Sequence, residues 1–517
     1  MTNATLEEKR SHLQQVLDAQ KSQESRNTWG QYATPFSLAK DIVACALQMN
    51  LSASTGKMLE PACGTGVFFS AMQQMLNVKQ LDGVLGFELD PHYYAPTAEL
   101  WQDYGVKVIC ADFLKQEPID HFPLLIANPP YSRHHHIDTK MKRWLQQEVK
   151  RQTGIRLSGL AGLYCYFMLL STRWLEPNGL SCWLIPSEFM DVNYGKAVKQ
   201  YLMENVNLIR IHRFHEKNLQ FSDALVTSSV VFFRHSAPSD TPVVFSMGNN
   251  ICQPEKEFLV ERKQMDASQK WTHYFLKETT SPATSSKQPR KTIGDYFVVK
   301  RGIATGCNSY FIINEETKDR YQFPNEYLTP ILPAPRKLKT DIITSHNGIP
   351  ALDETYYLFS TNDSIETIAH KHPSMLEYIK KGEEAHVDKT YICSRHTPWY
   401  QCERRHKAPF VIPYMGRGEN GRKMFRVILN ESDAIATNGY LLMYPKPEYA
   451  DLFRNPALVK SVWERLNSIN PDEFEKNGRF YGGGLHKLEP NELLSIPLEG
   501  LEHMLRDHDL FNAHYTV

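Results

Sequence analysis

The residues with the clearest chemical potential directly follow a strand-like apolar run. Residues 124–127 are apolar and are followed by Asn128, Pro129, Pro130 and Tyr131. Proline fixes the backbone and has no N–H group, so the Asn128 amide oxygen and a neighbouring carbonyl can both accept hydrogen bonds from one planar amino group. Two such acceptors localise on nitrogen a lone pair that is otherwise delocalised into a ring, and the nitrogen can then attack an electrophilic methyl group. The structural alternative is a rigid turn that only ends a strand.

Three other apolar runs end in residues that suit a nucleoside ligand. Glu60 is followed by a turn that contains Gly64 and Gly66, and the next two runs end near Glu88 and Asp112. Glycines let the backbone approach a ligand, and an acid about 20 residues further on binds ribose hydroxyls in dinucleotide-binding sheets. The last glycine of the pyrophosphate-binding motif is missing here. The pattern therefore favours a nucleoside ligand without a pyrophosphate over a dinucleotide.

A parallel sheet would bring these residues together. Between residues 58 and 233, short apolar runs alternate with helical stretches at a spacing of about 20 to 25 residues, which predicts parallel strands joined by crossover helices. Ligands bind at the carboxyl ends of the strands in such sheets. We therefore predict an α/β fold, doubly wound and mostly parallel, with about seven strands.

The composition changes along the chain and predicts four segments. Residues 1–28 are expected to form an N-terminal helical arm, residues 29–265 a catalytic domain, residues 266–292 a linker, and residues 293–517 a second, α+β domain. The linker is predicted from the run KETTSPATSSKQPRKT, which has almost no apolar residues. The arm has the apolar spacing of one amphipathic helix, and packing is its simplest role.

Charge is balanced over the whole chain but not locally. The sequence has 58 Lys and Arg against 58 Asp and Glu, which argues weakly against a polyanionic partner unless the charges are segregated. Residues 391–426 carry eight basic and two acidic residues, interleaved with aromatic ones. Such a stretch favours nucleic-acid contacts, although a solvated basic face is the alternative.

Several function classes are disfavoured by what the sequence lacks. No apolar run approaches the 18 residues of a membrane span, and the polar N-terminus does not look like a signal peptide, so we expect a cytoplasmic protein without membrane contacts. The nine cysteines form no Cys-x-x-Cys pair, and we expect no metal site. His134, His135 and His136 are adjacent and cannot all face one ion, so we interpret them as a polar loop.

The motifs LEPACGTG, GFELD, CADF and ANPPY together resemble the S-adenosylmethionine-dependent amino-methyltransferases. The match is to the gamma class of N6-adenine DNA methyltransferases of restriction-modification systems, the TaqI-like family. GQYATP at residues 30–35 and FSDALVTSS at residues 221–229 are similar to further segments of that family. So are RGIATGCN at residues 301–308 and YGGGLHKLEP at residues 481–490.

The resemblance implies a methyltransferase sheet followed by a DNA target-recognition domain, and it assigns site residues. Glu88 would hold the ribose of S-adenosylmethionine, and Asp112 with Phe113 its adenine. The cofactor-binding set it implies is Thr34, Pro35, Glu60, Pro61, Cys63, Gly64, Gly66, Glu88, Asp112 and Phe113. The catalytic set is Asn128, Pro129, Pro130, Tyr131 and Phe221, with the two aromatic residues against the flipped adenine. The DNA-binding set is Arg301, Arg395, Arg404, Arg405, Arg417, Arg422, Lys423, His486 and Lys487.

The implied activity is transfer of a methyl group to the N6 amino group of an adenine flipped out of double-stranded DNA. It would protect host DNA from a cognate restriction endonuclease. The alternatives are an RNA or protein (glutamine) N-methyltransferase, or a non-catalytic DNA-binding relative. Cytosine N4 methylation uses the same physics, and only the leading Asn of the motif favours adenine. The sequence leaves the recognition sequence, the endonuclease and the oligomeric state open.

Overall fold

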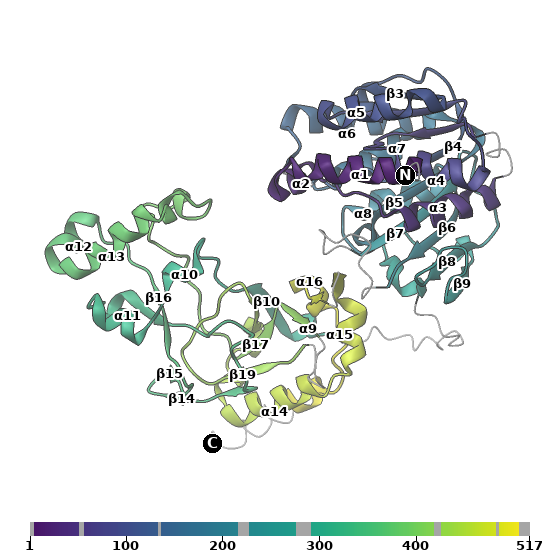
Figure 1. The fold of residues 1–517 in the computed structure, drawn as a ribbon. Helices are drawn as coiled ribbons and strands as arrows, with labels where there is room; N and C mark the ends of the chain where they lie inside the picture. Colours follow the sequence, from purple (N-terminus) through teal and green to yellow (C-terminus); the bar gives the residue numbers. More distant parts are fainter. Residues whose placement is uncertain are drawn as a thin grey trace. The chain divides into compact units, whose positions relative to one another are not determined.

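A computed structural model describes residues 5–50, 56–132, 136–215, 227–275, 291–417, 425–481 and 485–505. The chain forms two compact units (Figure 1). Most of the first unit lies in residues 1–283, and the second comprises Thr284–Arg479 and Leu485–Val517. The change from one unit to the other falls inside the predicted linker. No helix among the described residues is long and apolar enough to cross a membrane.

The first unit is built on a sheet of nine described strands, in the order β3-β2-β1-β4-β5-β7-β6-β8-β9. The strands are β1 (Met58–Glu60), β2 (Val84–Glu88), β3 (Val106–Cys110), β4 (Phe122–Ala127), β5 (Leu175–Pro186), β6 (Asn207–Arg213), β7 (Ser228–Arg234), β8 (Val243–Met247) and β9 (Lys256–Val260). The pairs from β3 through β5 are parallel, and β7 is antiparallel to both of its neighbours. The predicted doubly wound, mostly parallel sheet is confirmed. It is wider than predicted because β8 and β9 follow the stretch that showed the alternation.

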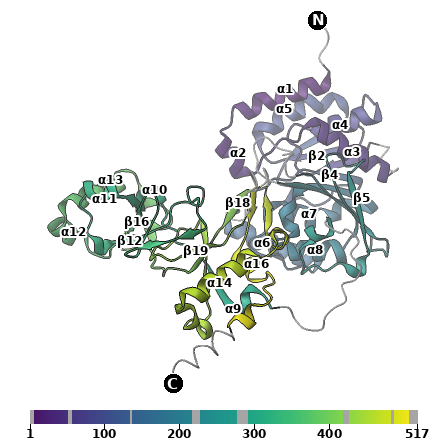
Figure 2. The same ribbon diagram turned by 90° about the horizontal axis from the view of Figure 1, so that it is seen from below.

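Helices cover both faces of this sheet. Helices α1 (Leu6–Ala19), α3 (Phe36–Met49), α4 (Val67–Leu76) and α5 (Pro91–Trp101) lie on one side, and α6 (Thr139–Thr153), α7 (Leu163–Leu170) and α8 (Gly195–Glu204) on the other (Figure 2). A short helix, α2 (Gln23–Trp29), follows α1. Helix α7 is apolar almost all round, and seven of its eight residues are buried, as its composition requires. Strands near the middle of the sheet, such as β4, are therefore buried on both faces.

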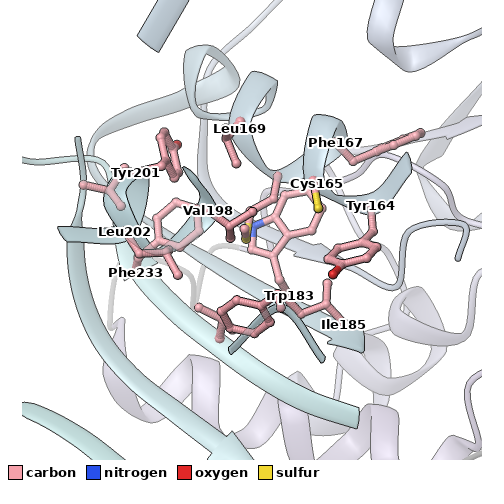
Figure 3. Close-up of a cluster of buried hydrophobic side chains, with 14 of the residues drawn as sticks. Tyr164, Cys165, Phe167, Leu169, Trp183, Ile185, Val198, Tyr201, Leu202 and Phe233 are labelled. Atoms are coloured by element: carbon pink, nitrogen blue, oxygen red, sulfur yellow. The ribbon is translucent and has the colours of Figure 1, made fainter. Parts of the chain in front are cut away.

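Aromatic side chains fill the core between α7, α8 and the sheet. Figure 3 shows Tyr164 and Phe167 of α7 and Tyr201 of α8 gathered around Trp183 of β5. Burying each such ring contributes roughly 1.5–3 kcal/mol relative to exposure. The Trp183 indole N–H donates to the Ser181 hydroxyl at 2.6 Å, so its one polar group is satisfied. This packing holds the carboxyl end of β5 beside that of β4.

The predicted linker begins too early in the sequence. Residues 266–275 belong to the first unit, where a 3-10 turn at Trp271–Phe275 packs its aromatic rings on Phe245 of β8. Trp271 is fully buried, and its indole N–H donates to the Asp266 carbonyl at 3.0 Å. The sequence around these rings is mostly polar, so it did not predict that they are buried. The first unit therefore continues beyond the predicted boundary at residue 265.

The second unit is an α+β structure, as predicted. Its largest sheet has the order β10-β20-β17-β19-β13, and three smaller sheets are β11-β16-β12, β14-β15 and β18-β22-β21. The strands are β10 (Phe297–Arg301), β11 (Ile312–Asn314), β12 (Leu328–Pro330), β13 (Ile342–Ile343), β14 (Ser345–His346), β15 (Ile349–Pro350), β16 (Tyr356–Phe359), β17 (Phe410–Pro413), β18 (Met415–Arg417), β19 (Ile428–Asn430), β20 (Tyr440–Pro445), β21 (Arg479–Tyr481) and β22 (Leu485–Lys487). The helices are α9 (Ile293–Tyr296), α10 (Asn308–Phe311), α11 (Glu315–Arg320), α12 (Ile365–Lys371), α13 (Pro373–Glu384), α14 (Pro456–Asn467), α15 (Pro471–Asn477) and α16 (Pro490–Leu494).

A buried histidine makes the stability of the first unit depend on pH. His212 of β6 is fully buried, with Nδ1 3.0 Å from the Ser246 hydroxyl and Nε2 3.2 Å from the Gly248 carbonyl. Burial is the main cause that lowers the pKa of His212 from 6.5 to about 4. Below pH 6.5 this histidine becomes protonated in the unfolded chain but stays neutral in the folded chain. The free energy of unfolding therefore falls as the pH drops toward 4. The loss should reach about 3 kcal/mol.

Urea unfolding of the first unit between pH 7 and pH 4 measures this effect. We expect His212→Gln to have a flatter stability profile than the wild type by about 3 kcal/mol, because glutamine does not titrate. His121→Gln removes an exposed histidine and is the matched control, which should follow the wild type. Equal pH profiles for His212→Gln and the wild type would contradict the assignment.

Candidate functional site

The carboxyl ends of four parallel strands meet at one edge of the first sheet. Strand order reverses between β1 and β4, which is where ligands bind in open α/β sheets. A cavity of about 570 Å³ lies at this edge. Among the predicted site residues, those that line it are Pro61, Gly64, Glu88, Asp112, Phe113, Asn128 and Pro130. Its size lies within the range of small-molecule and cofactor sites.

The turn after β1 contains two glycines, of which one faces the cavity and the other packs against the core. Gly64 has a left-handed backbone at φ +52°, and a Cβ added there would meet open space. Gly66 also has a positive φ, but a Cβ there would lie 2.4 Å from Phe69 and 2.6 Å from Trp101. Gly64 therefore lets the backbone face a ligand, whereas Gly66 is required by packing behind the turn.

Glu88 is held with its carboxylate oriented. One oxygen accepts the Gly64 N–H at 2.9 Å, and the other accepts the Asp90 N–H at 2.8 Å. Burial raises the pKa of Glu88, while these backbone donors oppose that rise. Each oxygen still has acceptor capacity for a ligand hydroxyl. The side chain is thus fixed before any ligand binds.

Asp112 and Phe113 begin a short turn at the end of the neighbouring strand β3. The Asp112 carboxylate caps this turn by accepting the Leu114 N–H at 3.2 Å. The Phe113 ring stacks on Phe167 of α7 with 5.8 Å between ring centroids. Both residues line the cavity together with Met141 and Leu145 of α6. This end of the cavity combines apolar walls with one carboxylate, which suits a planar heterocycle with a hydrogen-bond donor.

Five residues predicted for the cofactor do not line the cavity, and two of them, Glu60 and Cys63, are almost fully buried. Glu60 is 2% exposed and Cys63 is 3% exposed. Burial, together with the charge of nearby Glu88, raises the pKa of Glu60 well above its usual range, and Arg10 partly opposes the rise. Thr34 and Pro35 are also outside the lining, although Thr34 contacts Asn128. Of these residues, Thr34 supports the site by accepting a hydrogen bond from Asn128.

The Asn128 side chain is locked in one orientation. Its amide nitrogen donates to the Tyr32 carbonyl and to the Thr34 hydroxyl, both at 2.9 Å. A carbonyl can only accept, so the amide cannot be turned the other way without losing a bond. The amide oxygen is buried and accepts no hydrogen bond from the described residues. An unsatisfied buried acceptor costs about 1–3 kcal/mol, which binding of a donor would offset.

Gly30 fixes the loop that carries Asn128. The Tyr131 N–H donates to the Gly30 carbonyl at 3.1 Å. Gly30 has φ +68°, and a Cβ there would lie 2.3 Å from the Ser132 nitrogen and 2.5 Å from the Tyr131 nitrogen. The Tyr131 hydroxyl donates to the Leu184 carbonyl at 3.0 Å, and its half-buried ring packs near Tyr32 and Tyr164. Tyr131 is not among the residues that line the cavity, and Phe221 lies outside the described residues.

Sequence reasoning missed part of the cavity wall. Gln14 and Asp18 of α1 line the cavity, and so does Trp29, whose side chain is 53% exposed. The N-terminal arm was expected only to pack on the rest of the unit. No motif marked these residues, because an amphipathic pattern shows which face of a helix is buried but not what lies beside it.

The predicted DNA-binding residues of the second unit fall on several elements. Arg301 and Lys487 both lie near the ring of Tyr414, with their charged groups 4.1 and 5.0 Å from its centroid. Arg417 is exposed on β18, which pairs with the strand of Lys487. His486 is 6% exposed and is therefore not available as a surface contact. Arg422 and Lys423 lie outside the described residues.

The described basic residues of the stretch at residues 391–426 differ in exposure and in partners. Arg395 lies over the exposed Tyr391 ring at 3.8 Å, and Arg404 is exposed, while Arg405 pairs with Glu403 at 2.7 Å. Arg426 donates to the Thr340 and Leu338 carbonyls and pairs with Asp341, which is a structural role. Among the described residues, no group of His, Cys, Asp or Glu is arranged to hold a metal ion.

The contact at Gly30 can be tested by stability. Gly30→Ala combines a strained backbone with a clash against the Asn128 loop, whereas Gly154→Ala has φ +74° and open space around the new Cβ. We expect Gly154→Ala to lower the free energy of unfolding by about 1–2 kcal/mol, and Gly30→Ala to lower it by about 1–3 kcal/mol more. Urea unfolding measures both, and equal losses would contradict the close approach.

Comparison with known proteins places the chain in a family. The profile described as Eco57I restriction-modification methylase matches residues 97–221, and that described as Type II methyltransferase M.Eco57I, C-terminal domain, matches residues 268–514. Type II methyltransferase M.AccI of Acinetobacter calcoaceticus is 29% identical over 492 residues, covering 91% of this chain and 85% of the relative. M.XamI of Xanthomonas campestris pv. amaranthicola is 24% identical over 464 residues, covering 87% and 82%.

Solved structures agree on the fold. The type IIL restriction-modification enzyme MmeI in complex with DNA has a TM-score of 0.56 at 12% identity, with 87% of this chain and 66% of that chain covered. The DrdV–DNA complex has a TM-score of 0.54 at 12% identity, with 99% and 60% covered. The chain thus spans slightly less than two thirds of these two enzymes. One matched profile describes a restriction-modification methylase, the other profile and the two long curated matches describe type II methyltransferases, and the chain belongs to this family of methyltransferases.

Proposed function

We propose that the protein transfers a methyl group from S-adenosylmethionine to the N6 amino group of an adenine in double-stranded DNA. The observation that carries the proposal is the Asn128 amide, whose nitrogen is occupied by two acceptors and whose buried oxygen is left without a donor. The names of the relatives, all type II methyltransferases, support the reaction class. The base and the position on it are our inference from the amide geometry and the Asn-Pro-Pro-Tyr motif.

The cavity fits S-adenosylmethionine by size, charge and chemistry. Its lining includes the carboxylates of Asp18, Glu88, Asp90, Asp112 and Asp138, and no Lys or Arg among the described residues. The sulfonium and ammonium groups give the cofactor a net positive charge, so an acidic lining favours it. Glu88 would hold the ribose, Asp112 and Phe113 the adenine ring, and the backbone at Gly64 would face the methionine part. When bound, the cofactor supplies an electrophilic methyl group.

Asn128 would activate the target amino group as a fixed acceptor. Tyr32 and Thr34 hold the amide nitrogen, so the oxygen keeps its direction without reorganisation during the reaction. By family resemblance the Pro129 carbonyl would accept the second amino hydrogen. Two accepted hydrogen bonds raise the electron density at nitrogen, which would attack the methyl carbon directly. The bond from that carbon to the sulfonium sulfur would break with its electron pair left on sulfur, and the amino nitrogen would lose one proton to solvent. No covalent enzyme intermediate is required.

Target access would require base flipping. Extruding a base from duplex DNA costs a few kcal/mol, and stacking on an aromatic side chain returns about 1–3 kcal/mol. Tyr131 lies beside Asn128 in the same loop, with Tyr32 and Tyr164 near its ring. Its hydroxyl bond to Leu184 fixes the ring position. Tyr131 is therefore the described aromatic residue that we assign to the target base.

DNA binding is assigned to the second unit. Arg301 and Arg417 are exposed, and Lys487 is half-buried beside the same tyrosine as Arg301. Guanidinium and ammonium groups bind phosphates, and an arginine fork can also read a guanine edge. Protection of host DNA from a restriction endonuclease would be the role of the modification, as in other restriction-modification systems.

Variants of Asn128 and Thr34 test the amide mechanism. We expect Asn128→Ala to reduce the single-turnover rate of methyl transfer to DNA by at least about 100-fold, with cofactor affinity changed less than about threefold. Thr34→Val removes one of the two acceptors that hold the amide, and should slow turnover by roughly tenfold. Thr34→Ser keeps the hydroxyl and is the control. Full activity of Asn128→Ala would contradict the mechanism.

The role of the second unit is tested by Arg417→Ala. We expect DNA affinity to fall by about 5- to 100-fold, because one charge-assisted contact is lost, while S-adenosylmethionine affinity stays unchanged. If Arg417 contacts phosphate, the slope of log affinity against log salt should decrease by about 1. Fluorescence anisotropy with duplex DNA at several salt concentrations measures both. Unchanged DNA affinity would remove Arg417 from the DNA-binding set.

A further inference from the structure

We propose that Asp18, on the N-terminal helix α1, is an additional cofactor-binding residue of this enzyme. The inference rests on the proposed use of S-adenosylmethionine and extends it to a helix that precedes all the recognised motifs. Asp18 and Gln14 both line the cavity, and both lie on α1, which contacts α4 and α5. The argument depends on how firmly the helix is anchored and on which oxygen of Asp18 is left available.

An ion pair and a hydrogen-bond chain anchor α1 to the glycine turn. Arg10 is 5% exposed, and Glu7 accepts two of its N–H groups at 2.7 Å each. A third guanidinium N–H donates to the Thr65 hydroxyl at 2.9 Å. That hydroxyl donates in turn to the Gln14 amide oxygen at 2.6 Å. The helix is thus attached to the turn that contains Gly64, because Arg10 bonds to Thr65, which lies 55 positions further along the chain.

This chain ends at Asp18 and orients its carboxylate. One oxygen, Oδ1, accepts the Gln14 amide N–H at 2.8 Å and the Tyr93 hydroxyl at 2.7 Å. The other oxygen, Oδ2, accepts no hydrogen bond within the described part of the chain. With Oδ1 held by donors from α1 and α5, the half-buried carboxylate has a defined direction. Oδ2 is available to a donor in the cavity.

The other acid in this corner is already neutralised. The side chain of Asp90 accepts from the Lys21 ammonium and from the Gln31 amide, the latter at 3.1 Å. Burial alone would raise the pKa of Asp90, but these donors outweigh it and hold the pKa below its usual value. Asp90 therefore has its positive partner within the protein. The donors to the Asp18 carboxylate among the described residues are the neutral side chains of Gln14 and Tyr93, so no described cation pairs with it.

The cofactor offers two kinds of donor that suit Asp18. One is the ammonium group of the methionine part, and the other is a ribose hydroxyl. Asp18 connects through Gln14 to the glycine turn and through Tyr93 to the helix after β2, so it stands between the regions assigned to these two groups. The shared chemistry is a hydrogen-bond donor held by a carboxylate. 5′-Methylthioadenosine, which keeps the ribose but lacks the amino acid part, distinguishes the two.

Asp18→Asn is a sharp test because the folded structure can tolerate it. The asparagine oxygen can keep both bonds from Gln14 and Tyr93, while a donor amide replaces the free carboxylate oxygen. We expect the affinity for S-adenosylmethionine, measured by calorimetry on the full chain, to fall by about tenfold or more. Tyr93→Phe should weaken binding less, since it only loosens Asp18. Glu24→Gln removes an exposed carboxylate of the same arm and should bind like the wild type.

The outcomes separate the inference from the proposed function. A loss of affinity for S-adenosylmethionine alone assigns Asp18 to the ammonium group, and an equal loss for 5′-methylthioadenosine assigns it to the ribose. Wild-type affinity in Asp18→Asn, with an unchanged melting temperature, would overturn the inference while the proposed function stands. Absence of S-adenosylmethionine binding by the wild type would overturn both.

Discussion

The position of one amide oxygen is the constraint on which the site depends. The Asn128 nitrogen donates to Tyr32 and Thr34, and this leaves the oxygen pointing away from both with no protein donor of its own. Asparagine carries no charge, so in the proposed reaction Asn128 would contribute the direction of its oxygen and not basicity. The close approach of Gly30 to the Tyr131 and Ser132 backbone keeps the loop in register with the segment that holds the amide. A shift of the segment after Gly30 would move the Tyr32 carbonyl and the Thr34 hydroxyl together.

The sheet explains why this amide lies beside a cofactor cavity. Strands β1, β2, β3 and β4 end at one edge, so residues far apart in sequence, such as Glu88 and Asn128, face the same space. Aromatic packing of α7 and α8 against β5 supports this edge from below. On the other face, α1 reaches the glycine turn through Arg10 and completes the wall with Asp18. The site is therefore made from motifs on strand ends and from a helix without any motif.

Much of this arrangement could be predicted because it depends on local sequence. Alternating apolar runs predicted the parallel sheet, and the acids after β2 and β3 line the cavity as their position at strand ends required. Other features depend on contacts between distant residues and could not be predicted. Gly66 belongs to the motif but packs against Phe69 and Trp101, and Glu60 is buried, so neither residue lines the cavity. The buried rings of residues 271–275 lie in a mostly polar stretch, so the sequence did not mark them as core residues. Which basic residues are exposed and which have a structural role depends on distant partners such as Asp341.

The central claim is that this geometry methylates the exocyclic amino group of adenine in DNA. The most direct measurement is to incubate the protein with duplex DNA and methyl-labelled S-adenosylmethionine, digest the DNA to nucleosides, and identify the labelled nucleoside by mass spectrometry. We expect N6-methyldeoxyadenosine as the labelled product. Label found only in N4-methyldeoxycytidine, or only in RNA or protein offered in its place, would contradict the claim.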